Sequence, residues 1–245
     1  MGFLEKERKN NINNRRLAVL YDKKWRKFLK RARLFRFIPF VITVFGAGSM
    51  ALGSVRKHSD FDVLIIAKKG RIFTTRFFSV LFFDFFGWRR KSIIHKEEAS
   101  DKICLNHFIT SSVEDPGWPY NNYGEELYCS LIPLFGARED INNFFFSLKK
   151  ISSRVSFTED LRYRGDGKSF LKSALEKLFS GFLGNTLEKI LKFFQLKRIK
   201  KSLSKISLPK KARIKFSDDV LEFHPLIKPY SDKLDKVLTS SEISI

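Results

Sequence analysis

Two acidic residues, Asp60 and Asp62, stand one residue apart at the start of an apolar run that reads VLII. Residues i and i+2 of a strand point to the same side, so the two carboxylates are expected to lie next to each other. Paired carboxylates repel each other unless cations lie between them, and Mg²⁺ is held in proteins by one or two carboxylates together with substrate phosphates. The spacing therefore predicts a magnesium site, and two such ions can act on both oxygens of a phosphoryl transfer.

A glycine–serine pair, Gly48 and Ser49, precedes Asp60 by ten intervening residues. A turn of this kind can offer backbone N–H groups and a hydroxyl to the outer phosphates of a nucleotide. Glycine suits the position because a side chain would keep the backbone from approaching the phosphates closely. Together with Asp60 and Asp62, the pair predicts a site for a nucleoside triphosphate and its metal ions.

The same stretch has competing interpretations. Residues 45–51 fit the GxGxxA fingerprint of dinucleotide-binding proteins. That fold needs a whole crossover helix between its two strands, but only residues 52–59 separate the fingerprint from Asp60. The acid that binds ribose should also close the second strand, whereas Asp60 and Asp62 open it. A surface turn with chance spacing is the other alternative.

The stretch from Gly48 to Asp62 resembles the signature of the DNA polymerase β-type nucleotidyltransferase superfamily, G-S, about ten residues, then D-x-D. Ala51-x-Gly53 also matches a small motif of many small members, and GRIFTTR, DKICLN and FHP are similar to uncharacterised bacterial nucleotidyltransferase-domain proteins. The resemblance implies transfer of a nucleoside monophosphate from a nucleoside triphosphate to a hydroxyl, with Mg²⁺ and release of pyrophosphate. The resemblance also implies that Gly48 and Ser49 hold the triphosphate and that Asp60 and Asp62 bind the metals.

Active members of that superfamily normally carry a third carboxylate on a later strand, often as the general base. The third strand expected here offers Asn106, with Asp101 only at its leading edge, so Asp101 is the candidate third catalytic residue. An asparagine can coordinate Mg²⁺ but takes no proton near neutral pH. The sequence therefore leaves open whether the chain is an enzyme or a nucleotide- or nucleic-acid-binding module of the same fold that has lost turnover.

Four further residues are candidates for a role at this site. Arg76 could bind the triphosphate, because arginine pairs well with phosphate, or it could be the one group of an apolar helix that reaches water. Glu125 and Glu126 could supply a base or simply interact with a helix dipole. His224, within Phe-His-Pro, is expected to be a turn residue.

Positive charge is concentrated in two segments of the chain. Residues 1–36 hold thirteen Lys or Arg against three acids, and residues 189–216 hold eleven against none, which accounts for the net charge of +21. Segregated charge of this kind favours RNA or another polyanion, bound through phosphates with little sequence preference. A peripheral membrane protein that uses residues 77–86 and the basic segments is an alternative, as are plain solvated helix faces.

The remaining composition bears on compartment and membrane. The two cysteines form no CxxC pair, which favours a reducing cytoplasm, and the four scattered histidines do not suggest zinc. The first 36 residues contain no apolar run of a signal peptide. Residues 37–55 carry no charge, but their glycines favour a strand and a turn over a spanning helix. No integral membrane span is expected.

The elements that must position the site follow from periodicity and turn signals. Strands are predicted at 41–45, 62–66 and 102–110, and helices at 15–36, 71–86, 125–135, 141–151, 170–182 and 186–201, with Gly184 separating the last two. The helix at 71–86 is apolar nearly all round, so it is expected to be buried.

These elements predict an α+β fold, with a small mixed-sheet core followed by a helical C-terminal region. The division expected is a basic N-terminal helix at 1–36, a nucleotidyltransferase core at 37–115, a helical domain with a basic tract at 116–215, and a tail at 216–245.

Overall fold

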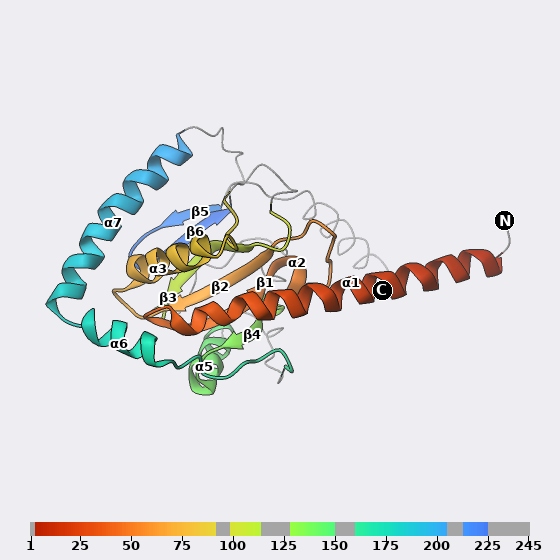
Figure 1. Ribbon diagram of the computed structural model, residues 1–245, viewed down its shortest axis with the longest axis horizontal. Coiled ribbons are helices and arrows are strands. Elements are labelled where there is room, and N and C mark those ends of the chain that lie inside the picture. The colour runs from red at the N-terminus through yellow and green to blue at the C-terminus, as the bar shows by residue number, and fades with distance from the viewer. Residues whose placement is uncertain (1–2, 92–98, 114–127, 150–159, 205–212, 225–245) are drawn as a thin grey trace.

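A computed structural model describes residues 3–91, 99–113, 128–149, 160–204 and 213–224. The centre of the fold is a six-stranded sheet in the order β4-β1-β2-β3-β6-β5 (Figure 1). Its strands are β1 Val41–Ala47, β2 Phe61–Ala67, β3 Ile103–Thr110, β4 Ile132–Phe135, β5 Arg213–Phe216 and β6 Val220–His224. The helices are α1 Phe3–Ala32, the 3₁₀ helix η1 Arg33–Phe37, α2 Gly48–Ala51, α3 Ile72–Phe85, α5 Arg138–Lys149, α6 Phe170–Leu178 and α7 Phe182–Leu203.

The sheet is mixed, because β2 and β3 run parallel while every other neighbouring pair is antiparallel. Helix α3 makes the crossover that a parallel pair requires. The short α2 joins β1 to β2, and these two strands are antiparallel. The dinucleotide interpretation of the glycine turn therefore fails, since that fold needs a parallel pair with a full helix between its strands.

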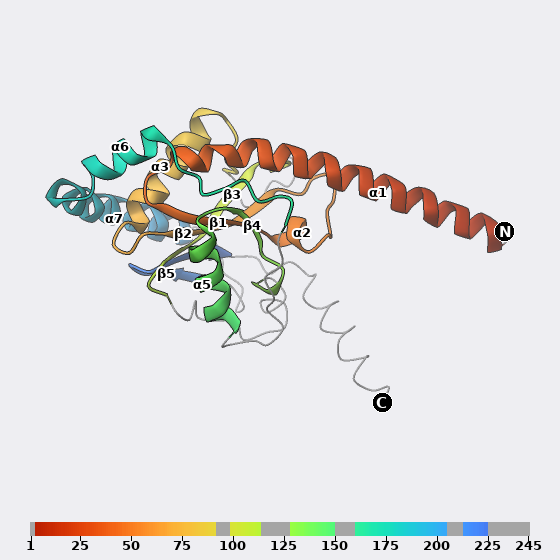
Figure 2. The same ribbon diagram turned by 90° about the horizontal axis from the view of Figure 1, so that it is seen from below.

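Each face of the sheet carries its own apolar core. Alternate residues of β2 separate the two: Phe61, Val63 and Ile65 pack with α1 and α3, whereas Leu64 and Ile66 pack with α5. Figure 2 shows α5 on one side of the sheet and α1, α3 and α6 on the other. In the α1 core the rings of Phe28 and Phe61 stack with centroids 4.8 Å apart. Burial of each such ring stabilises the fold by about 1.5–3 kcal/mol.

Most of the predicted elements are confirmed, and so is the α+β class. The three predicted strands appear with ends that differ by one or two residues, because each is an apolar run buried on both faces. Residues 37–55 form the end of η1, β1 and α2 rather than one long helix. Of the helices that the structure describes, none combines the length and the apolar character needed to cross a membrane.

Two of the element predictions are wrong. The helix predicted at 125–135 is wrong in its second half, where Ile132–Phe135 form a strand; Tyr128 and Cys129 are helical, and residues 125–127 lie outside the described part of the chain. Pro133 explains the strand, because proline breaks a helix but is tolerated at a sheet edge, where β4 lies. Gly184 does not separate two helices but lies within α7, where a Cβ would come within 1.8 Å of the Phe179 carbonyl oxygen.

The C-terminal segment also differs from a simple tail. Strand β6 pairs with β3 through His107 and Glu222, and β5 pairs with β6. Leu221 is fully buried in the same core as α1 and α3. The sheet therefore extends beyond residues 37–115 at both edges, with β4 on one side and the β5–β6 hairpin on the other.

Helix α3 is not buried on all sides, although its apolar sequence predicted that it would be. Ile72, Phe73 and Phe83 are buried, but Phe85 is 82% exposed, and Phe77 and Leu81 are exposed as well. The helix contacts the sheet on one side and α7 on another, and no described element covers the third.

Candidate metal and phosphate site

The two aspartates converge with a cysteine on the α5 side of the sheet. Asp62 lies in β2 directly beside Cys104 of the parallel strand β3, and Asp60 precedes β2 by one residue. A carboxylate oxygen from each aspartate and the Sγ of Cys104 all lie within 4.8 Å of one another. The side chains point away from the α1 core because Phe61 and Val63, which alternate with them, fill that core.

Gly48 lies against this group. Its φ is +62°, and a Cβ built on it would come within 2.2 Å of Asp62 Oδ2. The contact arises because Ala47, at the end of β1, is paired with Asp62 across the ladder. Both the positive φ and the closeness of the carboxylate require glycine at this position. The predicted meeting of the glycine turn with the acidic pair is therefore observed.

Ser49 carries a hydroxyl that has no partner among the described residues. Its Oγ is buried and makes no hydrogen bond to any residue that the structure describes. A buried polar group without a partner is unfavourable, so its presence next to Gly48 is consistent with a ligand that accepts or donates a hydrogen bond there.

Arg90 is the cation that faces the acidic pair. Its Nη1 atom lies 2.5 Å from Asp60 Oδ2 and 3.9 Å from Cys104 Sγ. Burial lowers the pKa of Arg90, but the neighbouring Asp60 carboxylate raises it, and the net direction is upward. The backbone N–H of Arg90 donates to Ile103 O, which fixes the arginine beside β3.

The Cys104 thiol stays protonated in this setting. Burial first, and then the charges of Asp62 and Asp60, raise its pKa well above the usual value for cysteine. A protonated thiol is a poor base and a soft ligand, so it does not replace a third carboxylate.

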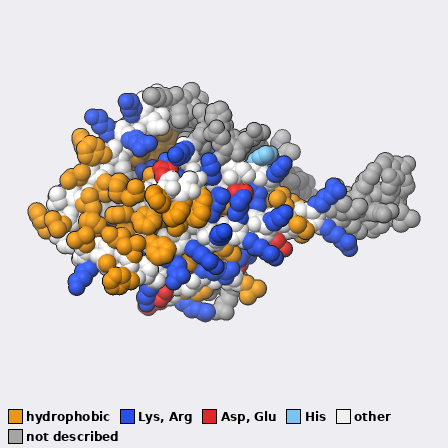
Figure 3. Space-filling model, in the orientation of Figure 1, with side chains coloured by type: hydrophobic (Ala, Val, Ile, Leu, Met, Phe, Trp, Pro, Cys, Tyr) orange, Lys and Arg blue, Asp and Glu red, His pale blue; other side chains and the backbone are white. Residues whose placement is uncertain are grey.

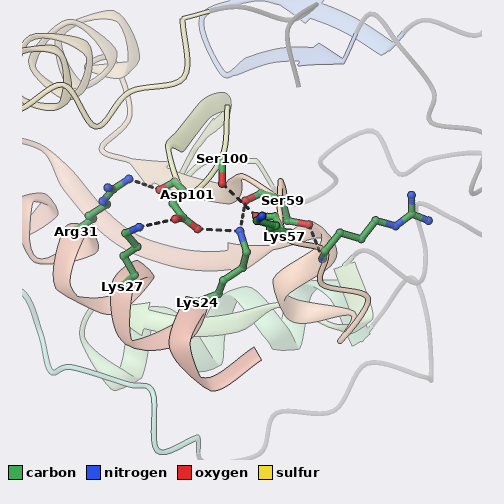
Figure 4. Close-up of polar contacts among 8 residues, drawn as sticks. Lys24, Lys27, Arg31, Lys57, Ser59, Ser100 and Asp101 are labelled. Carbon is green, nitrogen blue, oxygen red and sulfur yellow. Dashed lines mark hydrogen bonds and ion pairs between the residues drawn. The ribbon is translucent and has the colours of Figure 1, made fainter. Parts of the chain in front are cut away.

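Asp101 is held by α1 and is not part of the acidic group. Its carboxylate receives Lys24 Nζ at 2.8 Å and Lys27 Nζ at 2.5 Å, and Arg31 donates to its backbone carbonyl oxygen (Figure 4). Burial raises the pKa of Asp101, but the hydrogen bonds and charges of the two lysines outweigh it and lower the pKa overall. Asn106, the other candidate, lies inside β3, two residues beyond Cys104.

The other residues weighed for the site lie elsewhere. Arg76 is on the opposite face of the sheet, where its Nη1 donates to Gln195 Oε1 of α7 at 2.8 Å and its guanidinium lies over the Phe223 ring. His224 is the last residue of β6. Glu125 and Glu126 fall outside the described residues.

Cys104 and Arg90 are the two site residues that the sequence did not indicate. Cys104 becomes relevant only through the register of β2 and β3. Arg90 is thirty residues from Asp60, so no local spacing connects them. A cysteine two residues before Asn106 on the expected third strand was the one signal present in the sequence.

The donor set fits a hard divalent cation through its two carboxylates. Asp60 and Asp62 supply the oxygen ligands that Mg²⁺ prefers. Gly48 leaves the space that a side chain would fill, and the buried Ser49 hydroxyl lacks a partner among the described residues. In the described residues no third carboxylate joins them.

No family model, curated protein or solved structure matches this chain, so the fold and the geometry of this site are the basis for its function.

Proposed function

We propose that the protein is a nucleotidyltransferase, which transfers a nucleoside monophosphate from a nucleoside triphosphate to a hydroxyl acceptor and releases pyrophosphate. One observation carries the proposal. Asp60 and Asp62 converge on one face of the sheet, and the backbone of Gly48 lies directly against the Asp62 carboxylate. This arrangement supports the resemblance of residues 48–62 to the polymerase β-type signature.

Each residue of the group has a distinct role in the proposal. Asp60 and Asp62 hold Mg²⁺, which draws electron density from the phosphates and stabilises the charge that develops on them. Gly48 and Ser49 bind the β- and γ-phosphates through a backbone N–H and the hydroxyl. Arg90 is paired with Asp60 and offsets part of the negative charge of the site.

The acceptor is proposed to be RNA or another polyanion. Exposed cations on α1, such as Arg15, Arg16 and Arg26, are available for phosphate contacts. Lys24 and Lys27 are not, because both are engaged by Asp101. The basic surface of α1 is therefore smaller than the count of its cations suggests.

A second candidate is a nucleotide-binding module of the same fold without turnover. The observation that favours it is the position of Cys104, which stands beside the two aspartates while the Asp101 carboxylate is paired with α1. Without a third carboxylate, the described residues offer no base to remove the proton of the acceptor hydroxyl.

The test is incubation of the full chain with each of the four nucleoside triphosphates, labelled at the α-phosphate, together with cellular RNA and protein. We expect label transfer and pyrophosphate release that require Mg²⁺. Asp60→Asn and Asp62→Asn should each abolish transfer, whereas Asp166→Asn in an exposed loop should not. Transfer that survives both site substitutions would contradict the proposal. Magnesium-dependent binding without pyrophosphate release would assign the second candidate.

A pair of glycine variants tests the site without a known acceptor. Gly48 and Gly53 both have positive φ, so alanine strains the backbone by about 1–2 kcal/mol at either position. Only at Gly48 does the new Cβ collide with Asp62, since nothing lies within 4 Å of a Cβ at Gly53. In calorimetric titration with magnesium and nucleotide, Gly48→Ala should lose binding and Gly53→Ala should keep it. Equal affinities would exclude Gly48 from the phosphate site.

A further inference from the structure

One side of α3 is apolar and exposed. Phe77, Leu81 and Phe85 recur every four residues and so lie on one stripe of the helix. Phe86, directly after the helix, is exposed too. The opposite side of the helix, with Ile72 and Phe83, is buried in the core. The stripe is therefore additional to what the fold needs for its own packing.

Helix α7 lies beside α3 and extends this surface. Gln195 joins the two helices, because it accepts from Arg76 and donates to the carbonyl oxygen of Phe73. Glu188 of α7 accepts from the backbone N–H groups of Phe73 and Thr74, at 2.8 Å each. The pair is fixed by these bonds, so the exposed apolar residues of both helices have a defined arrangement.

The exposed apolar residues of α3, α6 and α7, with Phe86, form what is called here the apolar face. Figure 3 shows apolar side chains gathered over these helices and Lys and Arg gathered beside them. The face consists of Phe77, Leu81, Phe85, Phe86, Phe170, Leu171, Leu178, Phe182, Leu183, Ile190, Phe193 and Phe194. Monomers in water rarely expose continuous apolar patches of more than a few hundred Å², so a face of twelve large side chains indicates a partner.

The acidic residues of these three helices all form hydrogen bonds or ion pairs within the protein. Glu188 is bonded to the start of α3, and Glu176 of α6 accepts from the backbone N–H of Phe40 at 2.7 Å. Asp84 of α3 is paired with Arg89. The other charged side chains of α3, α6 and α7 are Lys and Arg, of which Lys192 is paired with Asp218.

The cations of α6 and α7 lie among the exposed aromatic residues. They are Lys177, Lys189, Lys192, Lys197, Arg198, Lys200 and Lys201; Lys192 is paired with Asp218, and Lys172 of α6 instead donates to the Val41 carbonyl oxygen. Arg198 and Arg89 act on the buried Arg76; burial first, and then these two charges, lower the pKa of Arg76 to about 10. Positive charge is therefore present on Arg76 below the apolar face as well as on the lysines around it. This charge favours an anionic partner.

A second copy of the chain does not meet this requirement. In a two-fold contact the same patch lies on both subunits, so the cations of α7 would face the cations of its copy. The chain as a whole carries a net charge of +21, which adds to the repulsion. An anionic bilayer offers both an apolar interior for phenylalanine and phosphate for lysine.

We propose that the apolar face of α3, α6 and α7 is a docking surface for an anionic lipid bilayer. The helices lie in the plane of the interface, with the phenylalanine rings at the acyl boundary and the lysine side chains extended to the phosphates. Asp60 and Asp62 are on the opposite face of the sheet, away from the bilayer. Docking is therefore independent of the nucleotidyltransferase proposal.

Flotation of the full chain with vesicles tests the docking surface. We expect it to float with vesicles of phosphatidylcholine containing about 30% phosphatidylserine and not with pure phosphatidylcholine, with binding that weakens at high salt. Phe85→Ser combined with Phe193→Ser and Phe194→Ser should weaken binding about tenfold or more, as should Lys197→Glu with Lys201→Glu.

The helix α5 supplies matched controls on the other side of the sheet. Phe146 is 64% exposed there and Lys149 is exposed nearby. Phe146→Ser and Lys149→Glu should leave vesicle binding unchanged, and circular dichroism should show every variant folded.

Three results would overturn the proposal. The first is no flotation with anionic vesicles, or flotation that the serine variants do not reduce. The second is a dimer in sedimentation equilibrium that the same serine variants dissociate, which would assign the face to a second copy. The third is binding of poly-glutamate without binding of vesicles, which would assign it to an acidic protein.

Discussion

At the scale of single residues, the partners of each carboxylate decide its role. Asp60 and Asp62 lie close together and Arg90 pairs with Asp60, whereas Asp101 receives two lysines of α1. The first arrangement gathers two carboxylates at one point, where a cation can lie between them. The second is neutralised within the fold, so Asp101 connects α1 to the start of β3.

The ion pairs of Asp101 predict a dependence of stability on pH. Because the pKa of Asp101 is lowered on folding, the pairs stabilise the protein above the ordinary aspartate pKa of about 3.9. This stability is lost as the pH falls through the lower, folded value. We expect Asp101→Asn to reduce the free energy of unfolding at pH 7 by about 1–2 kcal/mol, and to make little difference near pH 2.

Urea unfolding at the two pH values measures this effect. Asp218→Asn is the control, because Asp218 forms an exposed pair with Lys192 and should cost less than about 1 kcal/mol. An Asp101→Asn variant as stable as the parent chain at pH 7 would contradict the anchoring role. The same variant should leave nucleotide transfer intact.

At the scale of elements, α3 depends on α7 for its first turn. The first N–H groups of a helix have no partner within it, and α3 has neither a capping side chain nor an acid in that turn. Glu188 of α7 supplies both, by accepting from two backbone N–H groups and from the Thr74 hydroxyl. The cap also fixes the spacing of the two helices that form the apolar face.

Removing this cap should therefore weaken the protein. We expect Glu188→Ala to lower the free energy of unfolding by about 2–3 kcal/mol, because the buried N–H groups of Phe73 and Thr74 lose their acceptor. Lys189→Ala, next along α7 and exposed, should change it by less than about 0.5 kcal/mol. Thermal or urea unfolding followed by circular dichroism gives both values. Equal effects would exclude the capping role.

At the scale of the whole molecule, the sheet is completed by segments distant in the sequence. Strand β4 joins β1 at one edge, and β6 joins β3 on the other side. Leu221 of β6 is packed in the core that also contains Phe28 and Phe73. The hairpin near the C-terminal end is thus part of the same folding unit as α1.

A leucine pair tests this unity. Leu221→Ala should lower the free energy of unfolding by about 2–5 kcal/mol within a single transition, since it opens a cavity in the shared core. Leu161→Ala, at a side chain that is 96% exposed, should have almost no effect. Urea unfolding followed by fluorescence reports on the three tryptophans of the chain, of which Trp25 of α1 lies in that core. A Leu221→Ala variant that leaves this transition unchanged would show that the hairpin is an independent tail.

Local patterns in the chain were sufficient to predict most of the elements. The strands at 41–45 and 62–66 were visible because continuous apolar, β-branched runs bounded by turn residues have few alternatives. The helix at 71–86 was predicted from the length of its apolar run, and the helix at 141–151 was predicted as well. The spacing of Gly48, Asp60 and Asp62 also predicted that the glycine turn and the acids would meet.

What the tertiary structure alone decided was which distant groups lie together. The pairing of β3 with β2 places Cys104, and not a carboxylate, beside Asp62. The packing of α1 places Lys24 next to Asp101, so that this carboxylate forms an ion pair there instead. The packing of α7 against one side of α3 likewise left Phe85 uncovered. These outcomes depend on strand register and helix contacts between residues far apart in the chain, and hydrophobic periodicity carries information only about neighbours along it.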